Sequence, residues 1–229
     1  MNIATLISEF PRLWHMAEDG SWPSIQQHGL LSTSALLKHY EVAKPQRALL
    51  ESRRRPESVE ISRKGLPNAV IRDQKPLHEE KLRACLEDGV SPEDWYRILN
   101  ARTFFWVSRE RLIRLLNARA YRNKPHTILT VDTASLVTAH LKRIELCPIN
   151  SGATLFTPPK RGLLTFRPIS EYPYEELRRT KGRSGALAEF VVKEGVPDVA
   201  DHVIKVHRVD NGQYQSLWTR PGEPAGSGI

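Results

Sequence analysis

The chain has 229 residues, of which 40% are hydrophobic, so it can bury a sizeable core in one large domain or two small ones. Its 34 lysines and arginines outnumber its 26 acidic residues, and the net charge of +8 favours polyanionic partners or serves only solubility. We find no bilayer-spanning stretch, no signal-peptide pattern and no disulfide framework, because Cys85 and Cys147 lie far apart. We therefore expect a cytoplasmic protein without membrane contact.

The hydrophobic patterns predict short helices and strands interspersed along the chain, without an internal repeat. Ser91 followed by Pro92 marks a helix start, and Gly29 and Gly89 each end a helical pattern. This mixture is typical of an α+β fold with two small packed sheets and flanking helices. In chain order we expect strands at 12–17, 69–73, 102–109, 127–132, 143–147, 163–166, within 186–198 and at 202–209, and helices at 21–28, 34–40, 78–88, from 91, and at 109–120, 133–140 and 175–179.

We expect a single domain over residues 1–218 and a disordered tail over 219–229, because the tail is rich in proline, glycine and serine. Residues 44–64 form a basic insertion in that domain with little periodic apolar content. The insertion is either a solvated helix and loop or a mobile segment that contacts nucleic acid. Its cations are Lys44, Arg47, Arg53, Arg54, Arg55, Arg63 and Lys64.

The run 186–198 predicts a strand that carries one acidic residue, Glu189, where an apolar residue is expected. A basic loop, 178–183, lies just upstream. A carboxylate beside a cationic loop suits a site that handles an anionic substrate and a developing positive charge. The pattern alone favours a solvated glutamate on an edge strand.

Three segments carry a resemblance to a known family. The run LAEFVVKEGVPDVADHVIKV (187–206) resembles the catalytic-glutamate strand of NAD-dependent ADP-ribosyltransferases of the DarT type, bacterial toxins that modify DNA bases. Residues 13–31, with a strand histidine and a His-Gly-Leu turn, are similar to that group's opening segment. Residues 102–109 resemble its aromatic strand, which ends in a functional arginine. The segments occur in the family's order, and the whole chain also resembles a bacterial family described only as a domain of unknown function.

The resemblance implies an ADP-ribosyltransferase-like split β-sandwich with NAD in the cleft. Glu189 would be the catalytic carboxylate, which holds the ribose 2′-hydroxyl and stabilises an oxocarbenium-like transition state. His15 would hydrogen-bond a ribose hydroxyl of NAD. Arg109, with Arg102 as the alternative, would bind the pyrophosphate or orient the acceptor.

Other predicted contacts surround these groups. Aromatic side chains of the strand 102–106 are candidates for stacking on nicotinamide or a base, although strand aromatics usually belong to the core. The polar loop 150–154 suits ribose or phosphate but lacks the glycine spacing of a phosphate loop or a dinucleotide fingerprint. We find no metal-ligand spacing and expect no metal site. The predicted NAD contacts are Phe105, Trp106, Asn150 and Ser151, and the predicted nucleic-acid contacts are Arg178, Arg179, Lys181 and Arg183.

The sequence therefore predicts an NAD-dependent mono-ADP-ribosyltransferase, a glycosyltransferase that modifies nucleic acid, with DNA favoured over RNA. Such an enzyme would be a toxin or defence effector, with an antitoxin as a potential protein partner. Alternatives in the same class modify a protein or a small molecule, or only hydrolyse NAD. A non-catalytic nucleic-acid-binding module on the same fold is the alternative of another class. The enzyme requires His15, Arg109 and Glu189 at one cleft, whereas the module needs only a basic face.

Overall fold

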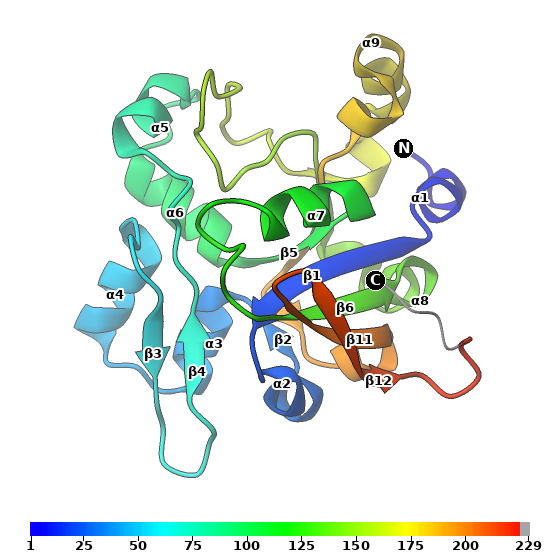
Figure 1. Ribbon diagram of the computed structural model, residues 1–229. Helices are drawn as coiled ribbons and strands as arrows, with labels where there is room; N and C mark the ends of the chain where they lie inside the picture. The colour runs from blue at the N-terminus through cyan, green and yellow to red at the C-terminus, as the bar shows by residue number, and fades with distance from the viewer. Residues whose placement is uncertain (225–229) are drawn as a thin grey trace.

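The computed structural model describes residues 1–224, and its central feature is an antiparallel sheet covered by helices (Figure 1). Within these residues the sheet has eight strands in the order β12-β11-β6-β1-β5-β9-β7-β8, and two two-stranded sheets, β10-β2 and β3-β4, accompany it. The strands are β1 (Arg12–Glu18), β2 (Leu30–Leu31), β3 (Val59–Ile61), β4 (Ala69–Ile71), β5 (Arg102–Trp106), β6 (His126–Asp132), β7 (Ile144–Cys147), β8 (Arg167–Pro168), β9 (Glu189–Lys193), β10 (Gly195–Val196), β11 (Val203–Asp210) and β12 (Gln213–Thr219).

Helices cover both faces of this sheet because its central strands are apolar on both sides. Helix α8 contributes Leu136 to the core cluster that contains Leu13 of β1, and α7 contributes Leu112 to a different cluster that contains Met16. Leu13 and Met16 point to opposite faces of β1. The helices are α1 (Ile3–Glu9), α2 (Trp22–His28), α3 (Thr33–His39), α4 (Lys44–Ser52), α5 (Glu79–Cys85), α6 (Pro92–Asn100), α7 (Arg109–Leu116), α8 (Thr133–His140) and α9 (Tyr174–Ala186), with 3-10 turns at Leu141–Arg143, Ile169–Glu171 and Val199–Asp201.

The eight strands fall into two halves of four. Strands β1 and β6 pair over the full length of β1, and β5 pairs with β9 over the full length of β5. Between the halves, β1 and β5 pair only at Trp14 and Trp106. The predicted α+β class is therefore confirmed. In place of two separate small sheets, the main sheet is continuous through this single pair.

Most predicted elements form within a few residues of their expected bounds. Ser91 caps α6 with a full capping box, in which its side chain and that of Asp94 bond each other's backbone amides. Two expectations were wrong, because residues 163–166 form turns and the basic loop 178–183 lies within α9. Residues 213–219, for most of which no element was predicted, form the strand β12.

The segment that contains the basic insertion forms a small unit with its own core. Leu37 and Tyr40 of the α3 region pack against Ile61 of β3 and Ile71 of β4. Most of the insertion is thus folded: residues 44–52 form helix α4, and residues 59–61 form β3 of a hairpin. This unit stands beside the main sheet, below α6 in Figure 1.

Thr219, where the predicted tail begins, ends β12, and the Arg220 side chain donates to the carbonyls of Val203 and Asp201. Residues 221–223 form a turn, in which the Glu223 amide donates to the Arg220 carbonyl, and residues 225–229 of the predicted tail lie outside the described residues. In the part of the chain that the structure describes, no helix combines the length and apolar character needed to cross a membrane.

Candidate functional site

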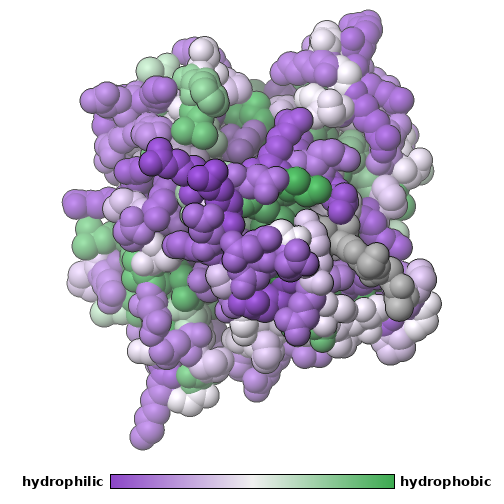
Figure 2. Space-filling view, in the orientation of Figure 1, coloured by the Kyte–Doolittle hydropathy of each residue, from purple (hydrophilic) through white to green (hydrophobic). Residues whose placement is uncertain are grey.

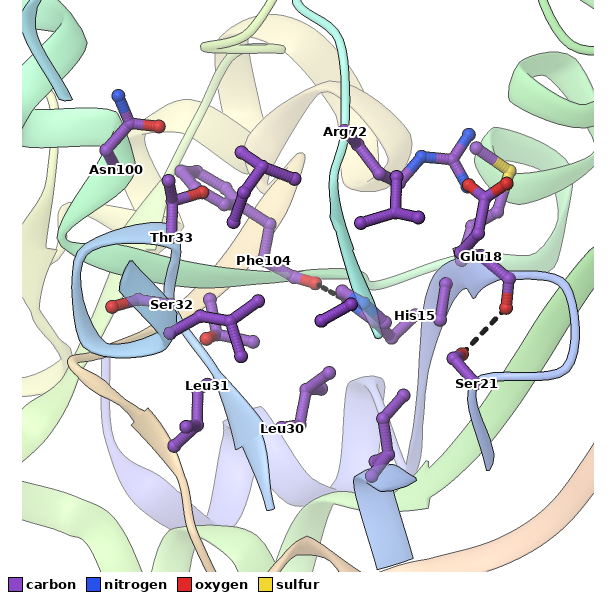
Figure 3. A pocket seen from close by; sticks show the side chains of 18 of the residues that line it. His15, Glu18, Ser21, Leu30, Leu31, Ser32, Thr33, Arg72, Asn100 and Phe104 are labelled. Atoms are coloured by element: carbon purple, nitrogen blue, oxygen red, sulfur yellow. Dashed lines mark hydrogen bonds and ion pairs between the residues drawn. The ribbon is translucent and has the colours of Figure 1, made fainter. Parts of the chain in front are cut away.

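A pocket of about 620 Å³ lies between the main sheet and the small unit of residues 33–73. This size is usual for a small-molecule site, and its walls are mainly apolar with a few polar groups. Figure 3 shows part of it, with His15 and Phe104 from the sheet, Ser32 and Thr33 at the start of α3, and Arg72, which follows β4 in the chain. Of the predicted site residues, His15, Phe105, Trp106, Asn150, Ser151 and Glu189 line this pocket.

The three segments of the resemblance meet on adjacent strands. Trp14 of β1 lies opposite Trp106 of β5, which lies opposite Glu189 of β9. The two ends of the resemblance also touch, because β2 after the His-Gly-Leu turn pairs with β10 after the glutamate strand. A Cβ atom on Gly29 would lie 2.4 Å from Pro197 Cα, so this contact requires glycine there.

Glu189 is the first residue of β9 and is only 4% exposed. Its strand lies between β5 and β7, so the expectation of a solvated glutamate on an edge strand was wrong. The Ser151 amide donates to Oε1 at 3.1 Å, and the Ser151 hydroxyl donates to Oε2 at 2.7 Å. Burial raises the pKa of Glu189 to about 7, although the bonds from Ser151 and Cys147 and the charge of Arg111 favour the carboxylate. The carboxyl group is thus poised to change charge near neutral pH.

His15 presents a neutral imidazole to the same pocket. Its Nδ1 donates to the Phe104 carbonyl at 2.8 Å, the interaction drawn as a dashed line in Figure 3. This bond fixes the tautomer and leaves Nε2 as an acceptor. Burial lowers the pKa of His15 to about 4, so the ring stays neutral at physiological pH. A neutral acceptor at this place suits a hydroxyl donor.

The pocket's cations differ from those predicted. Arg109 is exposed at the start of α7 and is not among the described residues that line the pocket. Arg102 lines it, but its Nε donates to Glu145 at 2.8 Å. Arg55 and Arg72 line it as well. Sequence reasoning assigned neither to the site. Arg55 lies in a run of cations with little apolar periodicity, which predicts a solvated segment, and Arg72 was assigned only to the predicted strand 69–73.

Arg55 is 6% exposed, and its guanidinium donates to the carbonyls of Arg72 and Leu50 and to the side chain of Asn100. No ion pair joins it to a carboxylate among the described residues, and burial lowers its pKa to about 10. Arg72 extends from β4, with Nη1 3.7 Å from Glu18 and its guanidinium over the Tyr121 ring. A buried cation without a carboxylate partner favours an anionic ligand nearby.

The predicted aromatic and loop residues have distinct surroundings. Phe105 is 1% exposed and packs edge-on against Phe190, so it belongs to the core as well as to the pocket wall. Trp106 is half-buried beside Glu189 in the sheet. Asn150 lines the pocket from the loop after β7, whereas Ser151 directs both its amide and its hydroxyl to Glu189.

The four cations predicted to contact nucleic acid lie on α9, apart from the pocket lining. Helix α9 projects from the top of the molecule, and the face that carries it is largely hydrophilic (Figures 1 and 2). Arg178 and Arg183 pair with Glu9 of α1, at 2.8 Å and 2.7 Å. Arg179 and Lys181 are the other two cations, and all four side chains are exposed.

A second polar cluster lies at the end of α8, where no metal site was predicted. His140, Asp198 and His202 gather their ligand atoms within 4.8 Å of one another. Arg143 donates to His140 Nδ1 at 2.7 Å, so the proton of the neutral ring is on Nε2, which donates to Asp198 at 2.7 Å. A metal ligand needs a lone pair at that nitrogen. The cluster as built is therefore a hydrogen-bond network.

The chain matches one family of known sequences. The model of a family of unknown function (DUF7002) matches residues 11–203, from the start of β1 to the start of β11. The chain belongs to this family. The matched segment contains both His15 and Glu189 and all the predicted NAD contacts between them. No curated protein matches the chain.

Proposed function

We propose that this protein is an NAD-dependent mono-ADP-ribosyltransferase that transfers ADP-ribose to nucleic acid, with DNA the favoured acceptor, as a toxin or defence effector. One observation carries the proposal: Glu189 and His15, from segments far apart in the chain, line one pocket together with Trp106. The single pairing between the two halves of the sheet supports a split β-sandwich of the ADP-ribosyltransferase kind.

The chemistry of these groups fits cleavage of the bond between nicotinamide and ribose. Glu189, once ionised, accepts a hydrogen bond from the ribose 2′-hydroxyl and stabilises the positive charge that develops as nicotinamide leaves. His15 accepts from another ribose hydroxyl through Nε2. Arg55 and Arg72 supply positive charge at the pocket wall for the pyrophosphate, the role predicted for Arg109.

Surface charge supports nucleic acid as the acceptor. The net charge of +8 and the exposed cations of α9 fit a polyanion. Two of these cations pair with Glu9, which reduces the charge that a phosphate backbone would meet.

Incubation with labelled NAD and separate pools of DNA, RNA and protein tests the proposal. We expect label in the DNA pool and none with the Glu189→Gln variant, which keeps the shape of the side chain. Release of nicotinamide without labelled acceptor would instead identify an NAD glycohydrolase. Nucleic-acid binding without any NAD cleavage would identify a binding module and refute the enzyme.

A further inference from the structure

Arg161 is a buried cation that the proposed chemistry does not use. It lies in the long connection between β7 and β8, and only 1% of its surface is exposed. Its Nε donates to the Pro159 carbonyl at 3.2 Å, and Nη1 donates to the Ser151 carbonyl at 2.9 Å, while Nη2 has no hydrogen-bond partner. No ion pair with a carboxylate forms among the described residues. The guanidinium lies over the Trp95 ring, 5.8 Å from its centroid, and its burial without a carboxylate partner is unfavourable.

Ser151 accepts a hydrogen bond from Arg161 and donates two to Glu189. Ser151 is fully buried, and all three of its polar groups have partners. Its carbonyl accepts from Arg161, while its amide and hydroxyl donate to the two carboxylate oxygens of Glu189. The guanidinium and the carboxylate thus fix one residue from opposite sides.

The backbone around Arg161 is itself anchored. Its amide donates to the Cys85 carbonyl, and its own carbonyl accepts from the Glu87 amide, each at 2.9 Å. Arg161 therefore joins the end of α5 to Ser151 across a connection, 148–166, that contains no helix or strand. Without this bond, Ser151 itself would be held only by Glu189, and the nearest other anchor of the loop would be Thr154, which bonds Pro76 and His78.

We propose that Arg161 is a positioning residue for Glu189, which acts by holding Ser151 in the orientation that fixes the carboxylate. The assignment of Glu189 as the reacting group rests on the proposed function, but the link between the two side chains does not. The positive charge of Arg161 also favours the ionised carboxylate, and the Glu189 charge in turn raises the pKa of Arg161 against the lowering by burial. The other groups that act on the Glu189 carboxyl are Cys147 and Arg111.

A direct titration of Glu189 tests this role without any substrate. Carboxyl carbon resonances are followed by NMR against pH, with Glu189→Gln to assign the signal. In Arg161→Met we expect the midpoint of the Glu189 titration to rise by about one pH unit, because a nearby opposite charge and the fixed donors are lost. Arg143→Met is the matched control, since Arg143 also donates to backbone carbonyls, those of Lys193 and Gly195, at the other end of β9. Its midpoint should equal that of the wild type.

Further variants separate positioning from a purely structural role. If Arg161→Met does not fold, Arg161→Gln keeps a donor for the Ser151 carbonyl and loses only the charge, so a smaller rise is expected in it. Ser151→Ala should raise the midpoint too, and the double variant should shift it by less than the sum of the two, since Arg161 acts through Ser151. A wild-type midpoint in a folded Arg161 variant, or strictly additive shifts, would overturn the proposal. Failure of the wild type to cleave NAD would refute the proposed function alone and leave this titration result standing.

Discussion

Replacing Glu189 with glutamine should stabilise the protein above neutral pH. The carboxyl group is 4% exposed, and its pKa rises from 4.5 to about 7 on folding. A raised carboxyl pKa gives stability that is complete below pH 4.5 and is lost as pH rises through 7. The loss amounts to about 3 kcal/mol, of which about 2 kcal/mol falls between pH 5 and pH 7. Glutamine carries no charge and retains an oxygen that accepts from the Ser151 amide.

Urea unfolding of the wild type and Glu189→Gln at pH 5, 6, 7 and 8 measures this effect. The difference in the free energy of unfolding should widen with pH by the amount given above, because every other titrating group is common to both proteins. Glu194→Gln, at an exposed position just after β9, is the control and should show a constant difference. Parallel curves for Glu189→Gln and the wild type would refute the inference that burial holds this carboxyl group protonated.

Four other measurements test separate parts of the molecule. NAD cleavage should rise with pH through about 7 as Glu189 ionises. His15→Ala should weaken NAD binding more than nucleic-acid binding, and unchanged NAD affinity in calorimetry would remove His15 from the site. Gly29→Ala should lower the free energy of unfolding by more than about 2 kcal/mol in urea, whereas Gly20→Ala, with a similar positive φ and open space, should cost less; equal losses would contradict the contact with Pro197. Replacing the four α9 cations with serine should flatten the salt dependence of nucleic-acid binding by about one log–log unit per lost phosphate contact, and an unchanged slope would exclude α9; the residues are Arg178, Arg179, Lys181 and Arg183.

Local patterns predicted most of the elements, since apolar periodicity and caps are local properties. The strand that carries Glu189 was found this way. Its burial was not, because it follows from the pairing of β9 with β5 and β7, which are distant in sequence. Arg55 escaped prediction for the same reason, since its acceptors come from Leu50, Arg72 and Asn100.

Two errors have local causes. The cations of 178–183 were assigned to a loop, but the chain stays helical there and only kinks at Gly182, which has a φ of 71°. Strand β12 was missed because it is a polar edge strand without alternation, although Asn211–Gly212 before it is a typical hairpin turn. The contact between Ser151 and Glu189 had no sequence signal, because a polar loop residue has many acceptors within reach.

The late position of β9 in the chain has a consequence for synthesis. Strands β5 and β7 are synthesised before β9, but β9 lies between them in the sheet and pairs with both. Strand β2 likewise has no partner until β10 has been synthesised. A nascent chain that ends before this point exposes unpaired strand edges and lacks the carboxylate at the pocket. Any activity of this pocket would therefore appear only after β9 has been synthesised and has paired with β5 and β7.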